Sequence, residues 1–170
     1  MKPRTFSLKI LGCLAILAGQ SDFAATSAGA ATVLALGASN TYGKGVARNQ
    51  AFPAQLEAIL RAKGLNVHVI NAGINGDTTE GMLRRMDHVV PNGTSAVILQ
   101  PGGNDGRKGS PDRTAEIQSR LSARGIQVIM LPNSVFKGLP HQPDGQHLTP
   151  EGYHMVAEYL ASQVAGAVSH

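Results

Sequence analysis

The sequence has almost no cysteine. Its 170 residues contain a single one, Cys13, which lies in an apolar stretch close to the start of the chain. If that stretch is removed, the remaining protein has no disulfide, no thiol nucleophile and no cysteine ligand for a metal, whatever the redox state of its compartment. The chain is long enough for one domain with a substantial core, and too short for two.

Residues 1–30 have the pattern of an export signal. A basic leader precedes an apolar run from Ile10 to Gly19, and the small residues Ala28-Gly29-Ala30 fit the small-x-small pattern that a signal peptidase cleaves. The run is too short for a permanent membrane span, which needs about 20 residues. We therefore expect a signal peptide over 1–30, a mature domain over 31–170, and a periplasmic or secreted protein.

The excess of basic residues comes partly from this leader. The whole chain has 15 Lys and Arg against 11 Asp and Glu, with a pI near 9.5. The leader holds three of the basic residues and one of the acidic ones, so the mature chain has 12 against 10 and a net charge of about +2. We infer no nucleic-acid partner from this balance.

Short apolar segments alternate with segments of helical spacing along the mature chain. The pattern predicts strands at residues 33–36, 67–71, 96–100 and 126–131, and helices at 52–63, 78–90, 110–124 and from Thr149 onward. No regular element is expected between residues 132 and 146. The alternation predicts one α/β domain, with a parallel sheet covered by helices on both faces.

The candidate reactive residues follow strands or lie in the last loop. Ser39 comes directly after the first strand, where it would stand at the rim of the sheet. A serine hydroxyl needs a base within hydrogen-bond reach, and His147 could serve as one. Asp144, three residues earlier, could fix the imidazole tautomer. The order Ser, Asp, His occurs in many hydrolases built on sheets, although Gly37-Ala38-Ser39 is not followed by the second glycine of a nucleophile elbow.

Three groups could stabilise negative charge on a substrate oxygen. They are the backbone N–H groups of Ser39 and Gly76 and the side-chain amide of Asn104. Gly76 is expected at the start of a helix, where the helix dipole also favours an anion. When they are considered one at a time, Ser39, Gly76 and Asn104 also fit ordinary turns.

Other polar and aromatic residues allow two interpretations each. Three histidines, His141, His147 and His154, accompany Asp144, but their spacing does not favour a metal site. The pair Arg107-Lys108 flanks the candidate site and fits either a solvated face or a contact with an anionic substrate. Likewise, Tyr42, Phe136 and Leu139 fit either the wall of an acyl pocket or packing under a loop.

Taken together, these segments resemble the SGNH hydrolases, also called the GDSL-type esterase/lipase family. The likeness is strongest to the acyl-CoA thioesterase I/lysophospholipase L1 group and spans about residues 31–165. It is carried by Leu36-Gly37-Ala38-Ser39, Phe52-Pro53-Ala54-Gln55-Leu56, Asn71-Ala72-Gly73-Ile74-Asn75-Gly76-Asp77-Thr78, Gly102-Gly103-Asn104-Asp105-Gly106 and Asp144-Gly145-Gln146-His147.

The resemblance implies a fold, an activity and a set of roles. The fold would be a flavodoxin-like three-layer α/β/α sandwich, and the activity would be hydrolysis of esters or thioesters through an acyl-enzyme. Ser39 would be the nucleophile, with Asp144 and His147 completing the triad. Gly76 and Asn104 would be oxyanion-hole donors beside the Ser39 amide. We expect no cofactor, a small-molecule ester or thioester as the substrate, and a monomer.

Two departures from the family pattern bear on the site. Ala38 stands where the family usually has an aspartate before the nucleophile. Only about a dozen residues separate Leu131 from Asp144, where the family usually has another helix and an edge strand. We therefore expect a short parallel sheet of about four strands and a shallow, open site.

Two alternatives to a lipid-type esterase or thioesterase stay open at this point. A carbohydrate O-acetylesterase would use the same chemistry, and a shallow site suits sugars. A non-catalytic flavodoxin-like binding module would retain the glycine loops without an active triad. The complete set of serine, histidine, aspartate and asparagine favours an enzyme.

Overall fold

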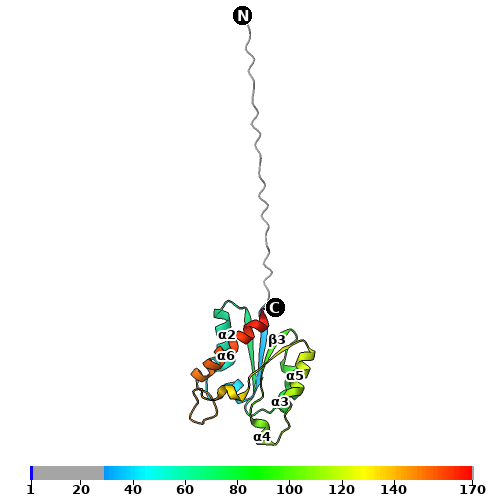
Figure 1. Cartoon of the computed structure of the whole chain (residues 1–170), viewed down its shortest axis with the longest axis vertical. Coiled ribbons are helices and arrows are strands. Elements are labelled where there is room, and N and C mark those ends of the chain that lie inside the picture. Colours follow the sequence, from blue (N-terminus) through cyan, green and yellow to red (C-terminus); the bar gives the residue numbers. More distant parts are fainter. Residues whose placement is uncertain (2–28, 170) are drawn as a thin grey trace.

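The computed structural model describes Met1 and residues 29–169, so nearly all of the expected signal peptide lies outside the described residues. Within the described part of the chain, the centre is a parallel sheet of four strands in the order β2-β1-β3-β4 (Figure 1). The strands are β1 (Ala31–Gly37), β2 (Val67–Gly73), β3 (Thr94–Gln100) and β4 (Gln127–Met130). The expected α/β class and the short sheet of four strands are confirmed.

The central strand β1 is buried on both of its faces. Val33 and Ala35 belong to the apolar core on one side of the sheet, while Leu34 and Leu36 belong to the core on the other side. All of them are fully buried. Side chains alternate between the two faces of a strand, so a strand covered on both sides needs a continuous apolar run, and β1 has one.

Helices cover both faces of the sheet. On one face lie α2 (Phe52–Ala62) and α6 (Pro150–Val168), and on the other lie α3 (Thr79–Val89) and α5 (Thr114–Ala123) (Figure 1). The arrangement confirms the three-layer sandwich. Along the chain, β2 is added on one side of β1 and β3 on the other side, so the strand order changes direction between β1 and β3. Open sheets of this kind bind ligands at this point, beyond the carboxyl ends of their strands.

The last helix begins immediately after the loop that carries the candidate base. The Thr149 hydroxyl accepts a hydrogen bond of 3.2 Å from the Gly152 N–H, and Pro150 is the first helical residue, as the sequence predicts. Tyr153 and Leu160 are fully buried against the sheet. The loop is therefore attached at its end to a long, well-packed element. Among the described residues, none of the helices combines the length and apolar character needed to cross a bilayer.

The connections contain short helical segments that the sequence analysis did not predict, because hydrophobic periodicity needs a longer window. They are α1 (Ser39–Tyr42), α4 (Asn104–Lys108) and two 3₁₀ turns, η1 (Arg48–Gln50) and η2 (Asn133–Phe136). The predicted start of a helix at Ser110 is wrong, since α5 begins at Thr114. The Thr114 N–H donates to the Asp112 Oδ1 and the Arg113 N–H donates to the Thr79 hydroxyl, both at 2.8 Å, so side chains bind the backbone just before the helix.

Candidate active site

Ser39 lies at the carboxyl end of β1, near the middle of the sheet edge. The strand ends at Gly37, Ala38 follows, and Ser39 is the first residue of α1. A Cβ atom at Gly37 would lie 2.1 Å from the Thr41 Oγ1, so only glycine fits this close approach. The chain thus turns directly from a buried strand into a short helix, and the turn leaves the Ser39 side chain at the rim of the sheet.

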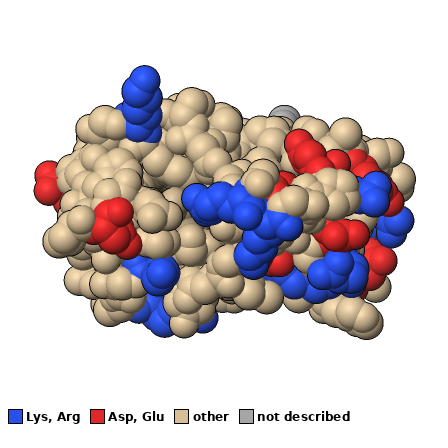
Figure 2. All heavy atoms as spheres, turned by 90° about the horizontal axis from the view of Figure 1, so that it is seen from below, with Lys and Arg blue, Asp and Glu red and all other residues tan. Residues whose placement is uncertain are grey.

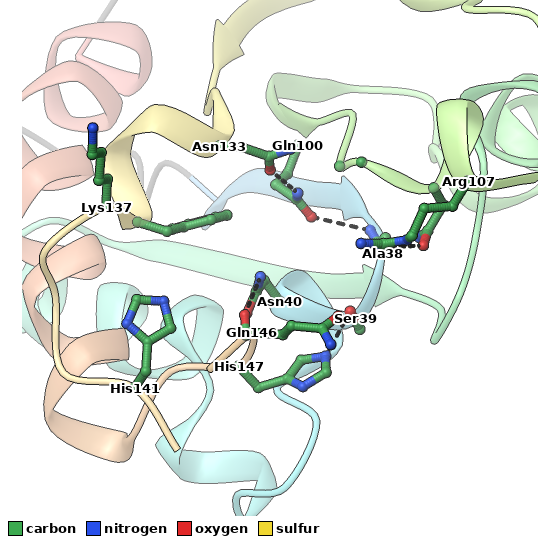
Figure 3. Close-up of a pocket in the computed structure, with 14 residues that line it drawn as sticks. Ala38, Ser39, Asn40, Gln100, Arg107, Asn133, Lys137, His141, Gln146 and His147 are labelled. Atoms are coloured by element: carbon green, nitrogen blue, oxygen red, sulfur yellow. Dashed lines mark hydrogen bonds between the residues drawn. The ribbon is translucent and has the colours of Figure 1, made fainter. Parts of the chain in front are cut away.

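A buried glutamine holds this turn. Gln100, the last residue of the neighbouring strand β3, is 1% exposed. Its Oε1 accepts hydrogen bonds from the Ala38 N–H and the Thr41 hydroxyl, both at 3.2 Å. Its Nε2 donates to the Asn133 Oδ1 at 3.0 Å (Figure 3). Ala38 offers no carboxylate to stiffen the turn, and the bonds that fix it come from β3 instead.

The ring of His147 lies between Ser39 and Asp144. Its Nε2 is 3.0 Å from the Ser39 Oγ (Figure 3), and its Nδ1 is 2.5 Å from the Asp144 Oδ2. His147 is a buried residue. When Nδ1–H donates to the carboxylate, the lone pair of the neutral ring is on Nε2, facing the serine hydroxyl. The arrangement has the geometry of a nucleophile, a base and an orienting carboxylate.

Asp144 also organises the loop that carries the histidine. Its Oδ1 accepts the backbone N–H of Gln146 at 2.9 Å and that of His147 at 3.0 Å. Gly145 between them has φ +65°, which suits glycine. The hydrogen bond to the imidazole, together with these two backbone bonds, holds the pKa of Asp144 well below its usual value. The carboxylate therefore stays ionised beside the ring.

Asn40 connects the serine turn to the histidine loop. Its Nδ2 donates to the Gln146 carbonyl at 3.4 Å, and its Oδ1 accepts the Tyr153 hydroxyl at 3.0 Å. Burial raises the pKa of Tyr153 to about 12, so the phenol is neutral and can donate this bond. One side chain next to the candidate nucleophile thus contacts both the loop and α6.

Asn104 lies at the start of α4, with its amide oriented by two hydrogen bonds. The residue is 6% exposed. Its Nδ2 donates to the Asp77 carbonyl at 2.7 Å, and its Oδ1 accepts from the Arg107 Nη2 at 2.6 Å. An amide nitrogen carries two hydrogens, so one remains for a further acceptor. Arg107 occupies the oxygen and thereby defines which end of the amide is the donor.

Gly76 lies beside the site but not at the start of a helix. The turn around it has the Asp77 N–H bonded to the Ile74 carbonyl at 3.2 Å, and Gly76 has φ +73°. The helix α3 begins three residues later with Thr78 as its cap, in agreement with the predicted range 78–90, so only the expectation that Gly76 itself lies at the helix start is wrong. The Thr78 hydroxyl accepts the Gly81 N–H, and this bond is what sets the helix boundary.

Two adjoining hollows flank Ser39, with volumes of about 260 Å³ and about 230 Å³. Both are lined by Ser39, Asn104, Arg107, Gln146 and His147. The first hollow extends to Phe136, Lys137 and His141, and the second to Lys44, Asn75 and Gly76. In Figure 3, Arg107 reaches toward the first hollow from one side, and Lys137 and His141 lie on the opposite side.

The fold brings the candidate residues together from distant parts of the sequence. Ser39, Gly76, Asn104 and His147 all line the second hollow, and Asp144 adjoins the imidazole. Their chemical roles stay predictions. Of the aromatic and aliphatic residues considered for an acyl pocket, Phe136 lines the first hollow, whereas Tyr42 and Leu139 line neither.

The sequence analysis missed several amides of the site, namely Asn40, Gln100, Asn133 and Gln146. Gln100 left a usable signal, because it is a polar residue at the end of the otherwise apolar run Ala96 to Leu99. Asn133 left none, since it lies in a loop that has no pattern of its own.

No metal-binding arrangement is present in the described residues. They contain no group of three or more His, Cys, Asp or Glu side chains that could hold an ion. His154, considered above with His141 and His147, lies on α6 with its Nδ1 2.8 Å from the Gln55 Oε1. Its neighbours belong to α2 and α6 and not to the loop of His147.

Comparison with known proteins gives the family. The model of the GDSL-like lipase/acylhydrolase family matches residues 35–165, which include the serine turn and the histidine loop. The chain belongs to this family. The resemblance seen in the sequence is thereby confirmed.

Two curated proteins are similar in sequence to this chain. The esterase TesA of Pseudomonas aeruginosa is 30% identical over 131 residues, which cover 74% of this chain and 63% of that protein. An arylesterase of Vibrio mimicus is 29% identical over 134 residues, covering 75% of this chain and 62% of that protein. The matched part of the chain therefore spans less than two thirds of either relative.

A solved structure of the same fold is the esterase EstA from a Pseudoalteromonas species, inhibited by monoethylphosphonate. It superposes with a TM-score of 0.67 over 82% of this chain and 99% of that one, at 17% sequence identity. At this identity the match supports the fold alone, and it agrees with the three-layer arrangement of Figure 1.

Proposed function

We propose that this chain is an exported serine hydrolase that cleaves carboxylic esters or thioesters through an acyl-enzyme. One observation carries the proposal: the Ser39 Oγ lies 3.0 Å from the His147 Nε2, and the Nδ1 of the same ring lies 2.5 Å from an ionised Asp144. Membership of the GDSL-like lipase/acylhydrolase family supports the same reaction class. The proposal that the protein is exported rests on the pattern of residues 1–30. The further proposal that it is a monomer rests on the sequence alone.

In the first half-reaction, the His147 Nε2 accepts the hydroxyl proton as the Ser39 Oγ attacks the substrate carbonyl carbon. The carbonyl π bond opens and its electron pair moves onto the oxygen. The free hydrogen of the Asn104 amide and the N–H groups of Gly76 and Ser39 are the candidate donors to that oxygen. Losing one such donor typically lowers kcat by about 10²–10³-fold. When the carbonyl re-forms, the bond to the leaving group breaks, and His147 gives its proton to the departing oxygen or sulfur.

Water completes the cycle in the second half-reaction. His147, again neutral, takes a proton from water as the water oxygen attacks the acyl carbon of the ester on Ser39. Collapse of this second oxyanion releases the acid and returns the proton to the Ser39 Oγ. Asp144 stays ionised throughout and stabilises the imidazolium that forms in each half. No step requires a metal or an organic cofactor.

The shape of the site favours small or partly exposed substrates. The two hollows have volumes of about 260 Å³ and about 230 Å³, each below the roughly 300–1,000 Å³ of pockets that enclose a drug-sized ligand. The similar proteins are named an esterase and an arylesterase, which agrees with short acyl esters of simple alcohols or phenols as substrates.

A carbohydrate O-acetylesterase is a second candidate within the same chemistry. The first hollow has room for an acetyl group and is lined by the side-chain amides of Asn133 and Gln146, whereas those of Asn40 and Gln100 are bonded within the protein at both ends. Amides can donate to and accept from sugar hydroxyls. Release of acetate from acetylated xylan oligosaccharides faster than from para-nitrophenyl acetate would favour this candidate over a simple arylesterase.

A fluorophosphonate probe tests the proposal on the purified mature protein. The probe phosphorus reacts with a serine oxygen only where a base and an oxyanion hole activate it. We expect covalent labelling of the wild type and none of Ser39→Ala. A matched control is Ser110→Ala. The Ser110 hydroxyl lies outside the two hollows and donates to the Glu80 Oε2 at 3.4 Å, so we expect labelling of this variant to be unchanged.

The same measurement separates an enzyme from a non-catalytic binding module. A binding module would remain unlabelled, and it would not hydrolyse para-nitrophenyl acetate, although its circular dichroism spectrum showed an intact fold. Labelling that persists in Ser39→Ala would also overturn the proposal, since the reactive serine would then be another residue.

A further inference from the structure

Ten of the twelve Lys and Arg residues in the described part of the chain fall into two groups according to their partners. One group consists of arginines that each lie within 3.8 Å of a carboxylate: Arg61, Arg84, Arg85, Arg113, Arg120 and Arg124. Most of these pairs lie on α2, α3 and α5, away from the two hollows, but the Arg85–Asp77 pair lies beside the site, since the Arg85 Nη2 also donates to the Gly37 carbonyl at 3.2 Å. Their charges are largely neutralised where they stand.

The second group surrounds Ser39. Arg107 lines both hollows, Lys137 lines the first and Lys44 the second, and the Lys108 Nζ donates to the carbonyl of Gly76 at 2.5 Å. Among the described residues none of these four forms an ion pair with a carboxylate. Figure 2, which views the molecule from the end where α4 lies, shows blue and red side chains adjoining at the right and blue side chains with few red ones at the centre.

No carboxylate in the described residues lines either hollow to offset these charges. Of three acidic side chains beside the site, one is paired with an arginine and the other two accept hydrogen bonds without a Lys or Arg partner, so four cations stand against two carboxylates that keep their charge. Asp77 pairs with Arg85 at 2.8 Å, Asp105 accepts the Thr79 hydroxyl at 2.8 Å, and Asp144 accepts from His147. The candidate active site therefore has a positive potential of its own, which attracts anions from solution and disfavours cations.

Arg107 is the residue of this group that can make a specific hydrogen-bonded contact with an anion in the hollows. One of its N–H groups donates to the Asn104 Oδ1 at 2.6 Å. A guanidinium has five N–H donors in a planar fork, so the side chain retains donors that match the two oxygens of a carboxylate or phosphate. Asn104 and Arg107 share one turn of α4, which holds the guanidinium next to the candidate oxyanion donor.

We propose that the substrates of this protein are esters that carry an anionic group, a carboxylate or a phosphate, close to the scissile bond, and that Arg107 binds this group in the first hollow. Lys44 and Lys137 add to the field around it, and His141 lines the same hollow, with its Nδ1 2.7 Å from the Leu139 carbonyl oxygen. The inference rests on the proposed ester hydrolysis and narrows it to a class of substrate.

Pairs of esters that differ only in one charge test the idea. The first pair is para-acetoxybenzoate and its methyl ester, which place the charge on the leaving group. The second pair is the para-nitrophenyl monoester of adipic acid and the corresponding methyl diester, which place it on the acyl group. Within each pair the measured quantity is kcat/KM for the anion divided by kcat/KM for the neutral ester.

We expect this ratio to fall by about 10- to 100-fold in Arg107→Met for at least one pair, the range expected for a hydrogen bond to a charged group. Arg107→Lys keeps the charge without the fork and recovers part of the ratio. Arg120→Met removes the same charge from the Glu116 pair on α5 and leaves the ratio unchanged. If Arg107→Met acts only by disturbing the Asn104 amide, kcat/KM falls equally for the anionic and the neutral ester of a pair. Such an effect therefore cancels in the ratio.

Three outcomes decide the matter. A ratio that falls for either pair in Arg107→Met, but not in Arg120→Met, supports the proposal and tells on which side of the ester the anion lies. Hydrolysis of all four esters with ratios unaffected by Arg107→Met overturns the anionic subsite and leaves the esterase intact. A protein that hydrolyses none of them and is not labelled at Ser39 overturns the esterase and the subsite together.

Discussion

The two halves of the candidate active site are built in different ways. The serine turn is part of the core: Ala38 is 3% exposed, Thr41 is fully buried, and both bond to Gln100, which is 1% exposed. The histidine loop lies on the surface, and the side chain of Asp144 is 43% exposed. One half obtains its geometry from packing and the other from a short local set of hydrogen bonds.

The difference predicts how each half responds to substitution. On the serine side, a change that disturbs the turn also leaves buried polar groups without partners, so activity and stability fall together. On the histidine side, exposed groups contribute little to the free energy of unfolding, and activity falls alone. The experiments below test whether substitutions in the two halves differ in this way in their effects on activity and stability.

Removal of the base has the largest expected effect. We expect His147→Ala to lower kcat for para-nitrophenyl acetate by about 10⁶-fold, because triad members act as a unit and the serine hydroxyl then has no proton acceptor. The pre-steady-state release of para-nitrophenol from this ester, followed by stopped flow, measures the acylation half-reaction directly. As a control, His154→Ala removes a histidine bonded to Gln55 and keeps full activity. Equal rates in wild type and His147→Ala would contradict the mechanism.

Asp144→Asn has the next largest effect and isolates the role of the carboxylate. We expect kcat to fall by about 10⁴-fold, because an amide can favour the wrong imidazole tautomer and cannot stabilise the imidazolium. The Asn oxygen can still accept the backbone N–H groups of Gln146 and His147 that Asp144 now accepts. The melting temperature is therefore expected to remain close to that of the wild type. A large loss of stability with little loss of kcat would reverse the contrast between the two halves.

Gln100→Leu tests the serine half. It leaves the Ala38 N–H and the Thr41 hydroxyl without their acceptor in a buried site, and unsatisfied groups of this kind cost about 1–3 kcal/mol each. We expect a lower free energy of unfolding in urea and a kcat reduced by roughly 10-fold or more, since small misplacements of reacting groups can cost up to about 10²-fold.

Gln100→Glu is the matched control for that experiment. The carboxylate retains an acceptor for Ala38 and Thr41, and Asn133 can turn its amide to donate to the other oxygen. Labelling by the fluorophosphonate probe should therefore be faster in Gln100→Glu than in Gln100→Leu when both are measured on folded protein. If the two variants label at the same rate, Gln100 supports the fold without positioning Ser39.

The same contrast explains what the sequence could predict. The strands and the longer helices were predictable because an apolar run such as Val33 to Leu36 has no other stable place than a buried strand. The candidate triad could be proposed from the sequence because Ser39 follows a strand, Asp144 and His147 lie three residues apart before the last helix, and all three match family motifs. These signals are local, and each can be found in a window of a few residues.

The supporting contacts were not predictable, because they join side chains from separate elements. Gln100 and Ala38 are 62 residues apart in sequence, and Tyr153 and Asn40 are 113 apart. The start of α5 was misplaced for a related reason, since the Arg113 N–H bonds to the Thr79 hydroxyl of another helix. Only the packed sheet brings such groups within hydrogen-bond distance.

Acid provides the mildest way to separate the two halves, because the histidine loop depends directly on the ionised Asp144, whereas the contacts of Gln100 in the serine turn are neutral. The pKa of Asp144 is lowered in the folded protein relative to the unfolded chain, mainly by its bond to the imidazole. Its contribution to stability is therefore complete above the unfolded value of about 3.9 and is lost as the pH falls below it. We expect the difference in melting temperature between wild type and Asp144→Asn to be small at about pH 5 and to shrink further toward pH 3, following the unfolded pKa of about 3.9. The difference between wild type and Gln100→Leu stays constant over that range, since neither Gln100 nor its partners titrate. A constant difference for Asp144→Asn as well would show that the carboxylate gains nothing from its charge, and that the histidine loop is held, like the serine turn, by neutral contacts.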